Sequence, residues 1–175
     1  MWDFFETVHR RHSVRKYQSD MPVEADKLHA ILETACAAPS AGDLQSYRII
    51  QVEQAETRAR LSAAAGDQDF LQEAPVLLVF CADPLTAGKE YGERGETLYA
   101  IQDTTIAAAY AQLAAVAAGM ASAWVGYFDE QQVIDALQLD VGLKPVAIIA
   151  IGYPAELPAP TPRRPIDEVV TQFPG

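Results

Sequence analysis

Two uninterrupted apolar segments limit the possible folds of this chain more than any other feature. They are APVLLVFCAD at residues 74–83 and KPVAIIAIGYP at residues 144–154, and both are rich in branched aliphatic side chains. Continuous apolar runs of this length are typical of strands that are buried on both faces. Two further strand-like segments, SYRIIQVE at 46–53 and ASAWVGYF at 121–128, would extend the same sheet. The chain therefore needs a central sheet with other elements around it.

Helical periodicity and helix start and stop signals predict those other elements. Apolar residues recur at helical spacing until Pro39 ends one such segment, and Asp129 is a good N-cap for DEQQVIDALQL. The polar, glycine-containing GKEYGERGE at 88–96 is expected to be a loop. The expected helices are residues 2–9, 24–38, 56–66, 98–119 and 129–139. This order of elements predicts a single α+β domain.

The residues after Gly152 differ in composition from the rest of the chain. Six of the eleven prolines lie there, so this tail cannot form a long helix or a central strand. Val169, Val170 and Phe173 suggest that the tail docks on a surface, and a partner subunit could supply it. We expect residues 1–153 to form the domain and residues 154–175 to be its extended tail.

Composition argues against several functions. A net charge of −11 disfavours general binding to nucleic acid or to an anionic membrane, because both need a broad basic surface. The most apolar long segment, 99–120, includes Gln102 and Asp103, which favours a buried helix with satisfied polar contacts over a membrane span. Two distant cysteines and three histidines lack metal-site or disulfide spacing. We therefore expect no metal, no apolar signal segment after Met1, and buried free thiols in a reducing cytoplasm.

Positive charge is concentrated in one short segment, HRRHSVRKY at residues 9–17. Four of the thirteen Lys and Arg residues of this acidic chain lie in these nine positions. A solvated basic patch at a helix end is one interpretation. A phosphate site is the other, because Arg11, Ser13 and Arg15 alternate and would share one side of an extended segment. A second cation pair, Arg163-Arg164, suggests that the two regions share an anion.

A second segment, APSAGDLQSYRII at residues 38–50, is on its own a plain helix-to-strand connection. Together with RRHSVRKY, however, it resembles the FMN-dependent nitroreductase family, whose members have an Arg-x-Ser-x-Arg start and a Pro-Ser-x-x-Asn-x-Gln turn. The resemblance continues in order through EAPVLLVF, YAIQDTTIAAAYAQLAAVAAGM, WVGYFDEQQVIDAL, KPVAIIAIGYPAE and RRPIDEVV. It covers nearly the whole chain and identifies a small, compact member.

The resemblance implies an α+β sandwich in which helices flank a central, mostly antiparallel sheet. It also implies an intertwined homodimer with two FMN sites at the subunit interface, and a tail that packs on the partner. The long helix at 98–119 would form much of the dimer core. The residues that match FMN-binding positions are Arg11, His12, Ser13, Arg15, Pro39, Ser40, Ala41, Asp43, Gln68, Val125, Gly126, Arg163 and Arg164. Of these, Pro39, Ser40 and Ala41 would reach the flavin of the other subunit.

The resemblance also implies a reaction. NAD(P)H would reduce the flavin and leave, and a nitroaromatic, a quinone or a similar small acceptor would then enter in a ping-pong cycle. Arg15 and Gly126 would tune the flavin rather than transfer protons, since the cofactor supplies the redox chemistry. A specialised flavin dehydrogenase or dehalogenase acting on one metabolite is the first alternative. A non-catalytic flavin-binding dimer and an anion-binding regulatory module are the others.

Three departures from the family pattern bear on the site. Asp43 stands where many members have Asn, so its role near a flavin is in doubt. Ser46-Tyr47 replaces a common Pro-Trp pair. The segment at 84–97 is short, which implies an open substrate pocket that Tyr91 and Tyr99 could line, although exposed or core positions are the simpler expectation for both.

Overall fold

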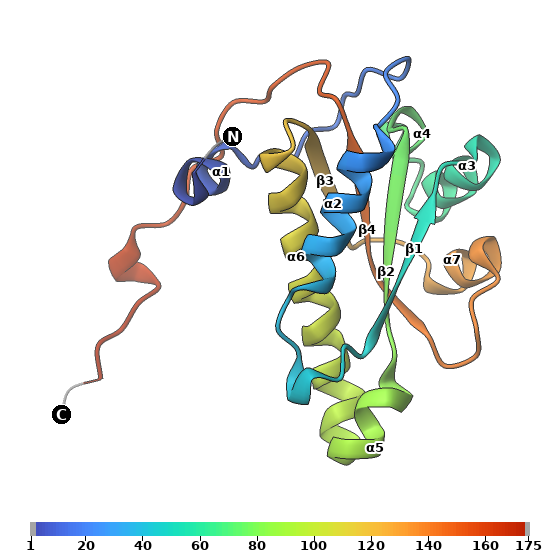
Figure 1. Ribbon diagram of the computed structural model, residues 1–175, viewed down its shortest axis with the longest axis vertical. Helices are drawn as coiled ribbons and strands as arrows, with labels where there is room; N and C mark the ends of the chain where they lie inside the picture. Colours follow the sequence, from blue (N-terminus) through green and yellow to red (C-terminus); the bar gives the residue numbers. More distant parts are fainter. Residues whose placement is uncertain (1–2, 174–175) are drawn as a thin grey trace.

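The computed structural model describes residues 3–173 and is built around one antiparallel sheet (Figure 1). Its strands are β1 (Tyr47–Val52), β2 (Val76–Ala82), β3 (Ala121–Val125) and β4 (Lys144–Gly152). They pair in the order β1-β2-β4-β3, and every pair is antiparallel. The two apolar segments are therefore the two central strands, as their composition predicts, and all seven residues of β2 are buried.

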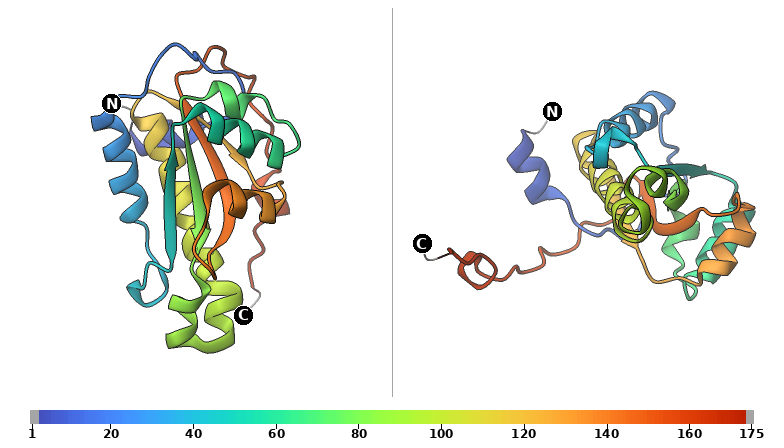
Figure 2. Two further views of the ribbon diagram at one scale, coloured as in Figure 1. Left: turned by 90° about the vertical axis from the view of Figure 1, so that its right-hand side faces the viewer. Right: turned by 90° about the horizontal axis from the view of Figure 1, so that it is seen from below.

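Helices cover both faces of the sheet, which explains why β2 has no polar side. Helices α2 (Ala25–Cys36) and α6 (Ala100–Ala117) lie on one face. Helices α3 (Ala55–Ala64), α4 (Phe70–Glu73) and α7 (Glu130–Leu137) lie on the other (Figures 1 and 2). Alternate residues of β2 enter the two cores: Leu78 packs with α2 and α6, and Leu77 packs with α3 and α7. The predicted α+β sandwich is confirmed.

The polar segment at 88–96 is helical, so the loop prediction is wrong. Helix α5 (Pro84–Arg94) begins where the Asp83 carboxylate accepts hydrogen bonds from the Thr86 amide at 3.1 Å and the Thr86 hydroxyl at 2.8 Å. A kink at Gly92 and a π-turn, η2 (Gly95–Tyr99), then lead into α6. The N-cap and the proline at the first helical position outweigh the glycines in the segment. Strand β3 is also shorter than expected, because it ends before Gly126.

The two ends of the described chain leave the compact body. Helix α1 (Phe4–Arg10) exposes Phe4 and Phe5, and Trp2, expected to begin this helix, lies outside the described residues. The tail runs away from the sheet with a single 3-10 turn, η3 (Ile166–Glu168), and residues 161–173 are all exposed (Figure 2). Its exposed apolar side chains are Leu157, Ile166, Val169, Val170 and Phe173. Between residues 3 and 173, no helix is both long and apolar enough to cross a membrane.

Candidate functional site

The basic segment is fixed to the edge of the sheet by its backbone. Ser13 forms a parallel bridge with Ser122 of β3, where the Val14 amide donates to the Ser122 carbonyl at 3.1 Å. Tyr17 then pairs with Pro154, just beyond β4. The Tyr17 ring packs directly on Gly152, where a Cβ atom would lie only 3.0 Å from that ring. Val14 and Tyr17 are buried, so they anchor the segment and leave the polar residues between and before them at the surface.

Some side chains of this segment have no partner within the described chain, and others are paired. Within residues 3–173, those of Arg11 and Ser13 form no hydrogen bond or ion pair, and both residues are half-buried, as is His12. The Arg15 guanidinium is exposed and lies 5.9 Å from the centre of the Phe70 ring. Lys16, in contrast, pairs with Glu156 at 3.0 Å. Donors without an internal partner at a well-anchored position suit an external anion.

Three more predicted site residues lie near this segment. Gln68 is half-buried in the turn before α4, where its amide donates to the Ala65 carbonyl at 2.9 Å. The same short stretch carries Phe70, over which Arg15 lies. The turn also adjoins the chain that leaves β3, because the Asp129 amide donates to the Ala64 carbonyl at 2.8 Å. Val125, which is buried, and Gly126, which is exposed, are at that end of β3.

The Pro39–Ala41 turn, which continues to Ser46, is held in a different way, by side chains. The backbone of its second half has an unusual conformation. Gly42, Asp43 and Gln45 all have left-handed conformations, with φ of 57°, 54° and 48°. The Gln45 amide donates to the Ser40 hydroxyl at 3.0 Å. The Tyr91 hydroxyl lies so close to Gly42 that a side chain there would collide with it. Asp43 is exposed and lines a surface hollow beside the turn.

Asp103 fastens this turn to the long helix. Its side chain is buried in α6 and accepts hydrogen bonds from the Ala41 amide at 2.9 Å and from the Ser46 hydroxyl at 2.6 Å. The expected buried polar contact is thus confirmed, and it forms within one chain. A pocket of about 530 Å³ opens beside it; its walls include Pro39, Ser40, Ala41 and Tyr99. Tyr99 therefore lines a pocket, with Tyr91 edge-on to it at 5.2 Å between ring centres.

One chain does not bring the two groups of predicted residues together. Ser46 and Tyr47 lie beside Ala82, at one end of β2, whereas Tyr17 and Pro154 lie beyond the other end. Figure 1 shows the turn near α5 at the bottom of the view and the basic segment at the top. Arg163 and Arg164 lie in the exposed tail, where Arg163 donates to the Thr161 carbonyl at 3.1 Å. Each end of the sheet thus carries part of the expected site.

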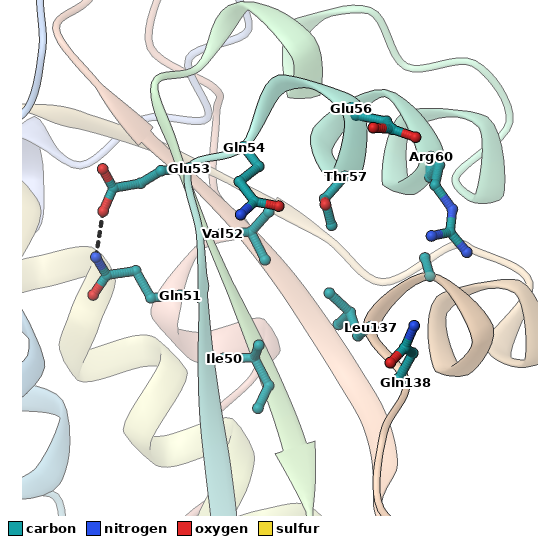
Figure 3. Close-up of a pocket in the computed structure, with 11 residues that line it drawn as sticks. Ile50, Gln51, Val52, Glu53, Gln54, Glu56, Thr57, Arg60, Leu137 and Gln138 are labelled. Carbon is teal, nitrogen blue, oxygen red and sulfur yellow. Dashed lines mark hydrogen bonds between the residues drawn. The ribbon is translucent and has the colours of Figure 1, made fainter.

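Another pocket, of about 580 Å³, lies elsewhere, between β1, α3 and α7 (Figure 3). It contains none of the predicted site residues. Some of its polar groups are engaged within the chain: Gln51 bonds to Glu53, and the Arg60 guanidinium donates to the Asp135 carbonyl at 3.0 Å. We therefore assign no ligand to this groove.

The cysteines differ from one another. Cys81 is buried in β2, and burial raises the pKa of its thiol to about 12. Cys36 is exposed at the end of α2, so the expectation of two buried thiols is wrong for this residue. Both thiols are free. In residues 3–173, no three His, Cys, Asp or Glu side chains gather in a way that could hold a metal ion.

Comparisons with known proteins agree with this architecture. The sequence matches the nitroreductase family over residues 8–68 and 62–153. It is 32% identical to an NADH dehydrogenase of Thermus thermophilus, across 92% of this chain and 91% of that protein. It is also 32% identical to an FMN reductase [NAD(P)H] of Bacillus subtilis, across 93% and 70% of the two chains.

Solved structures give the same result. B. megaterium NfrA2 superimposes with a TM-score of 0.91 at 28% identity, across all of this chain and 76% of that one. The NADPH:FMN oxidoreductase of Vibrio harveyi, complexed with NAD+, superimposes with a TM-score of 0.89 at 27% identity, across 98% and 77%. The chain belongs to the nitroreductase family. It is accordingly an FMN-dependent oxidoreductase, as the order of its sequence motifs predicts.

Proposed function

We propose that this protein takes reducing equivalents from NADH or NADPH onto FMN and passes them to a small acceptor, such as a nitroaromatic or a quinone, in a ping-pong cycle. The observation that carries the proposal is the anchored basic segment, in which the side chains of Arg11 and Ser13 have no hydrogen bond or ion pair within the described residues. The names of similar proteins support the donor: an FMN reductase [NAD(P)H] in Bacillus subtilis and an NADPH-flavin oxidoreductase in Vibrio harveyi.

The residues of the segment fit the acidic end of FMN. A phosphate monoester carries nearly two negative charges at pH 7 and accepts several hydrogen bonds, which Arg11 and Ser13 can donate. Arg15, exposed beside Phe70, supplies positive charge next to Gln68 and the end of β3. Gly126, exposed at that end, leaves its backbone open to a planar ligand. When bound, FMN supplies the electron-transfer chemistry, and these side chains bind it, orient it and balance its charge.

The complete site would need two copies of the chain. Pro39, Ser40 and Ala41 lie at the far end of the sheet from Arg11, so a second copy would supply them to the same cofactor. The exposed apolar residues of α1 and of the tail would be covered in such a homodimer, and the tail would bring Arg163 and Arg164 to the partner. Burial of such apolar groups is the usual driving force for association. We further propose a cytoplasmic location, where NAD(P)H and free thiols are maintained.

The decisive experiment is a visible absorption spectrum of the purified protein before and after anaerobic addition of NADH or NADPH. We expect a yellow protein that releases FMN on denaturation and is bleached by a nucleotide. Yellow protein that neither nucleotide bleaches would favour a specialised flavin enzyme or a non-catalytic flavoprotein. Protein that stays colourless after reconstitution with FMN would contradict the proposal.

A truncation tests the proposed subunit arrangement. Deleting residues 156–175 removes the exposed apolar tail and leaves every residue of the sheet in place. We expect the full chain to be a dimer by light scattering, and the truncated chain to be mainly monomeric and poor in FMN. A truncated chain that remains dimeric and yellow would contradict the role of the tail.

A further inference from the structure

We propose that Asp103 is a positioning residue, which holds the Pro39–Ala41 turn in the shape that receives the cofactor. The inference rests on the proposed function for the identity of the ligand. The physical basis of the inference is independent of the proposed function, because a buried carboxylate in α6 joins the turn to the helix through two hydrogen bonds.

The turn needs outside support because its backbone is unfavourable on its own. Asp43 and Gln45 have left-handed conformations, which residues with side chains seldom adopt. Such conformations persist only where surrounding contacts impose them. Asp103 provides contacts on both sides of the strained part, through the Ala41 amide before it and the Ser46 hydroxyl after it. The carboxylate therefore spans the turn.

The contacts of Asp103 differ from those of the next buried polar residue in the same helix. Thr104 is also fully buried, but its hydroxyl donates to the Ala100 carbonyl of α6 at 2.6 Å, so it serves its own helix. Asp103 directs one carboxylate oxygen to each side of the turn. The Ser46 carbonyl also accepts a hydrogen bond from the Asp83 amide at 2.9 Å, which links Ser46 to the end of β2. The turn is thus fixed to both the helix and the sheet.

Three variants and a matched control separate positioning from simple stability. Asp103→Leu removes both acceptors, and Ser46→Ala removes one donor. Asp103→Asn keeps an oxygen for the Ala41 amide and can still bond to Ser46, with the direction of that bond reversed. Thr104→Val is the control, because it removes a buried hydroxyl one residue away without touching the turn.

Each full-length variant would be measured in three ways. FMN affinity comes from quenching of flavin fluorescence, and the shape of the site comes from the visible circular dichroism of bound flavin. Amide hydrogen exchange reports on residues 40–46 of the apoprotein. We expect Asp103→Leu, which removes two buried hydrogen bonds to a charged group, to weaken FMN binding by about tenfold or more. Exchange in the turn should accelerate together with a changed dichroism spectrum, and Asp103→Asn should restore most of both.

The outcomes distinguish this inference from the proposed function. Thr104→Val should leave FMN affinity and exchange in the turn at wild-type values even if it lowers the melting temperature. If Asp103→Leu does not fold, Ser46→Ala compared with Asp103→Asn decides the matter, with the larger loss expected for Ser46→Ala. Unchanged exchange in the turn, or faster exchange with unchanged FMN affinity, would overturn the role of Asp103. A wild-type protein that binds no FMN would instead overturn the proposed function.

Discussion

The basic segment and the Pro39–Ala41 turn are held in place by different parts of the chain. The basic segment is held by its backbone, through Ser122 and Pro154, and the side chains of Arg11 and Ser13 have no hydrogen bond or ion pair within the described residues. The turn is held by the side chain of Asp103, and its backbone is strained. In the proposed site, side chains of the first region would bind the ligand while its backbone fixes their position. In the second region, a side chain fixes the backbone, which would face the ligand.

This difference means that the two regions should fail in different ways. Removing an exposed cation from the basic segment should cost ligand binding but little stability, because the anchors Val14 and Tyr17 remain. Altering the turn should cost stability as well, because its shape is part of how α6 packs. The predictions below test this contrast, from the largest expected effect to the smallest.

The double variant Arg11→Ala/Arg15→Ala should have the largest effect. Each hydrogen bond between a cation and FMN contributes ~1.5–3 kcal/mol, so losing one at the phosphate and one at the flavin should lower FMN affinity by about a hundredfold or more. The thermal midpoint of the apoprotein should change by no more than about 2 °C, as expected for surface positions. Flavin fluorescence titration and calorimetry would measure the two quantities.

Lys16→Ala is the matched control for that double variant. Lys16 is adjacent in sequence but pairs with Glu156, so its loss should leave FMN affinity nearly unchanged. Equal losses for Lys16→Ala and Arg15→Ala would mean that only the general charge of the segment matters. Full FMN content in the double variant would remove the basic segment from the site.

Gly42→Ala tests the strained turn. A side chain at a φ of 57° costs ~1–2 kcal/mol of folding free energy, and this one would also meet the Tyr91 hydroxyl. Gly119→Ala has the same kind of backbone cost, with a φ of 79°, but no atom nearby. Urea unfolding should therefore find Gly42→Ala the less stable of the two. Tyr91→Phe in the same chain should bring Gly42→Ala close to Gly119→Ala, and a persistent gap would argue against the Tyr91 contact.

The smallest effect concerns the N-terminal end of α2, whose C-terminal end leads into the turn. The Tyr153 hydroxyl bonds to Glu24 at 2.8 Å, and this bond, followed by those from the Glu24 backbone and Lys27, lowers the pKa of the carboxyl from 4.5 to about 2. A lowered pKa in the folded state stabilises the protein above pH 4.5 and ceases to do so as the pH falls toward 2. Carboxyl NMR should find Glu24 still charged at pH 3.5 in the wild type.

Tyr153→Phe should move that titration toward the ordinary value, and FMN binding at pH 7 should not change. Because Glu24 is exposed, the stability change should be slight. An unchanged Glu24 titration in Tyr153→Phe would show that the hydroxyl is not the cause.

Much of the fold follows from local pattern, and the exceptions have physical causes. The segments that become β2 and β4 are apolar because helices cover both of their faces, so composition alone identifies them. Helix α5 is missed because Gly88, Gly92 and Gly95 suggest a loop, while the Asp83-Pro84 start signal is easy to overlook. The end of β3 is misjudged because Tyr127 and Phe128 continue its apolar pattern beyond the last paired residue.

Some features of the candidate site also follow from local sequence, and others do not. Arg11, Ser13 and Arg15 could be predicted from the sequence because they alternate within a short segment rich in Arg and Lys. The tie between Asp103 and Ala41 joins residues 62 positions apart, and no local pattern encodes it. A single Asp in an apolar helix predicts a buried partner but not which one. The assignments of all the predicted site residues, Asp43, Arg163 and Arg164 among them, stay predictions.

The separation of the two regions along the sheet also affects how the enzyme responds to dilution. If one FMN is bound by both regions, it is bound by a dimer, and FMN binding then depends on the concentration of the chain. Apparent FMN affinity should rise with enzyme concentration, and a dilute stock should lose colour and activity together. Added FMN would reverse both losses, since it would stabilise the dimer as well as serve as the cofactor.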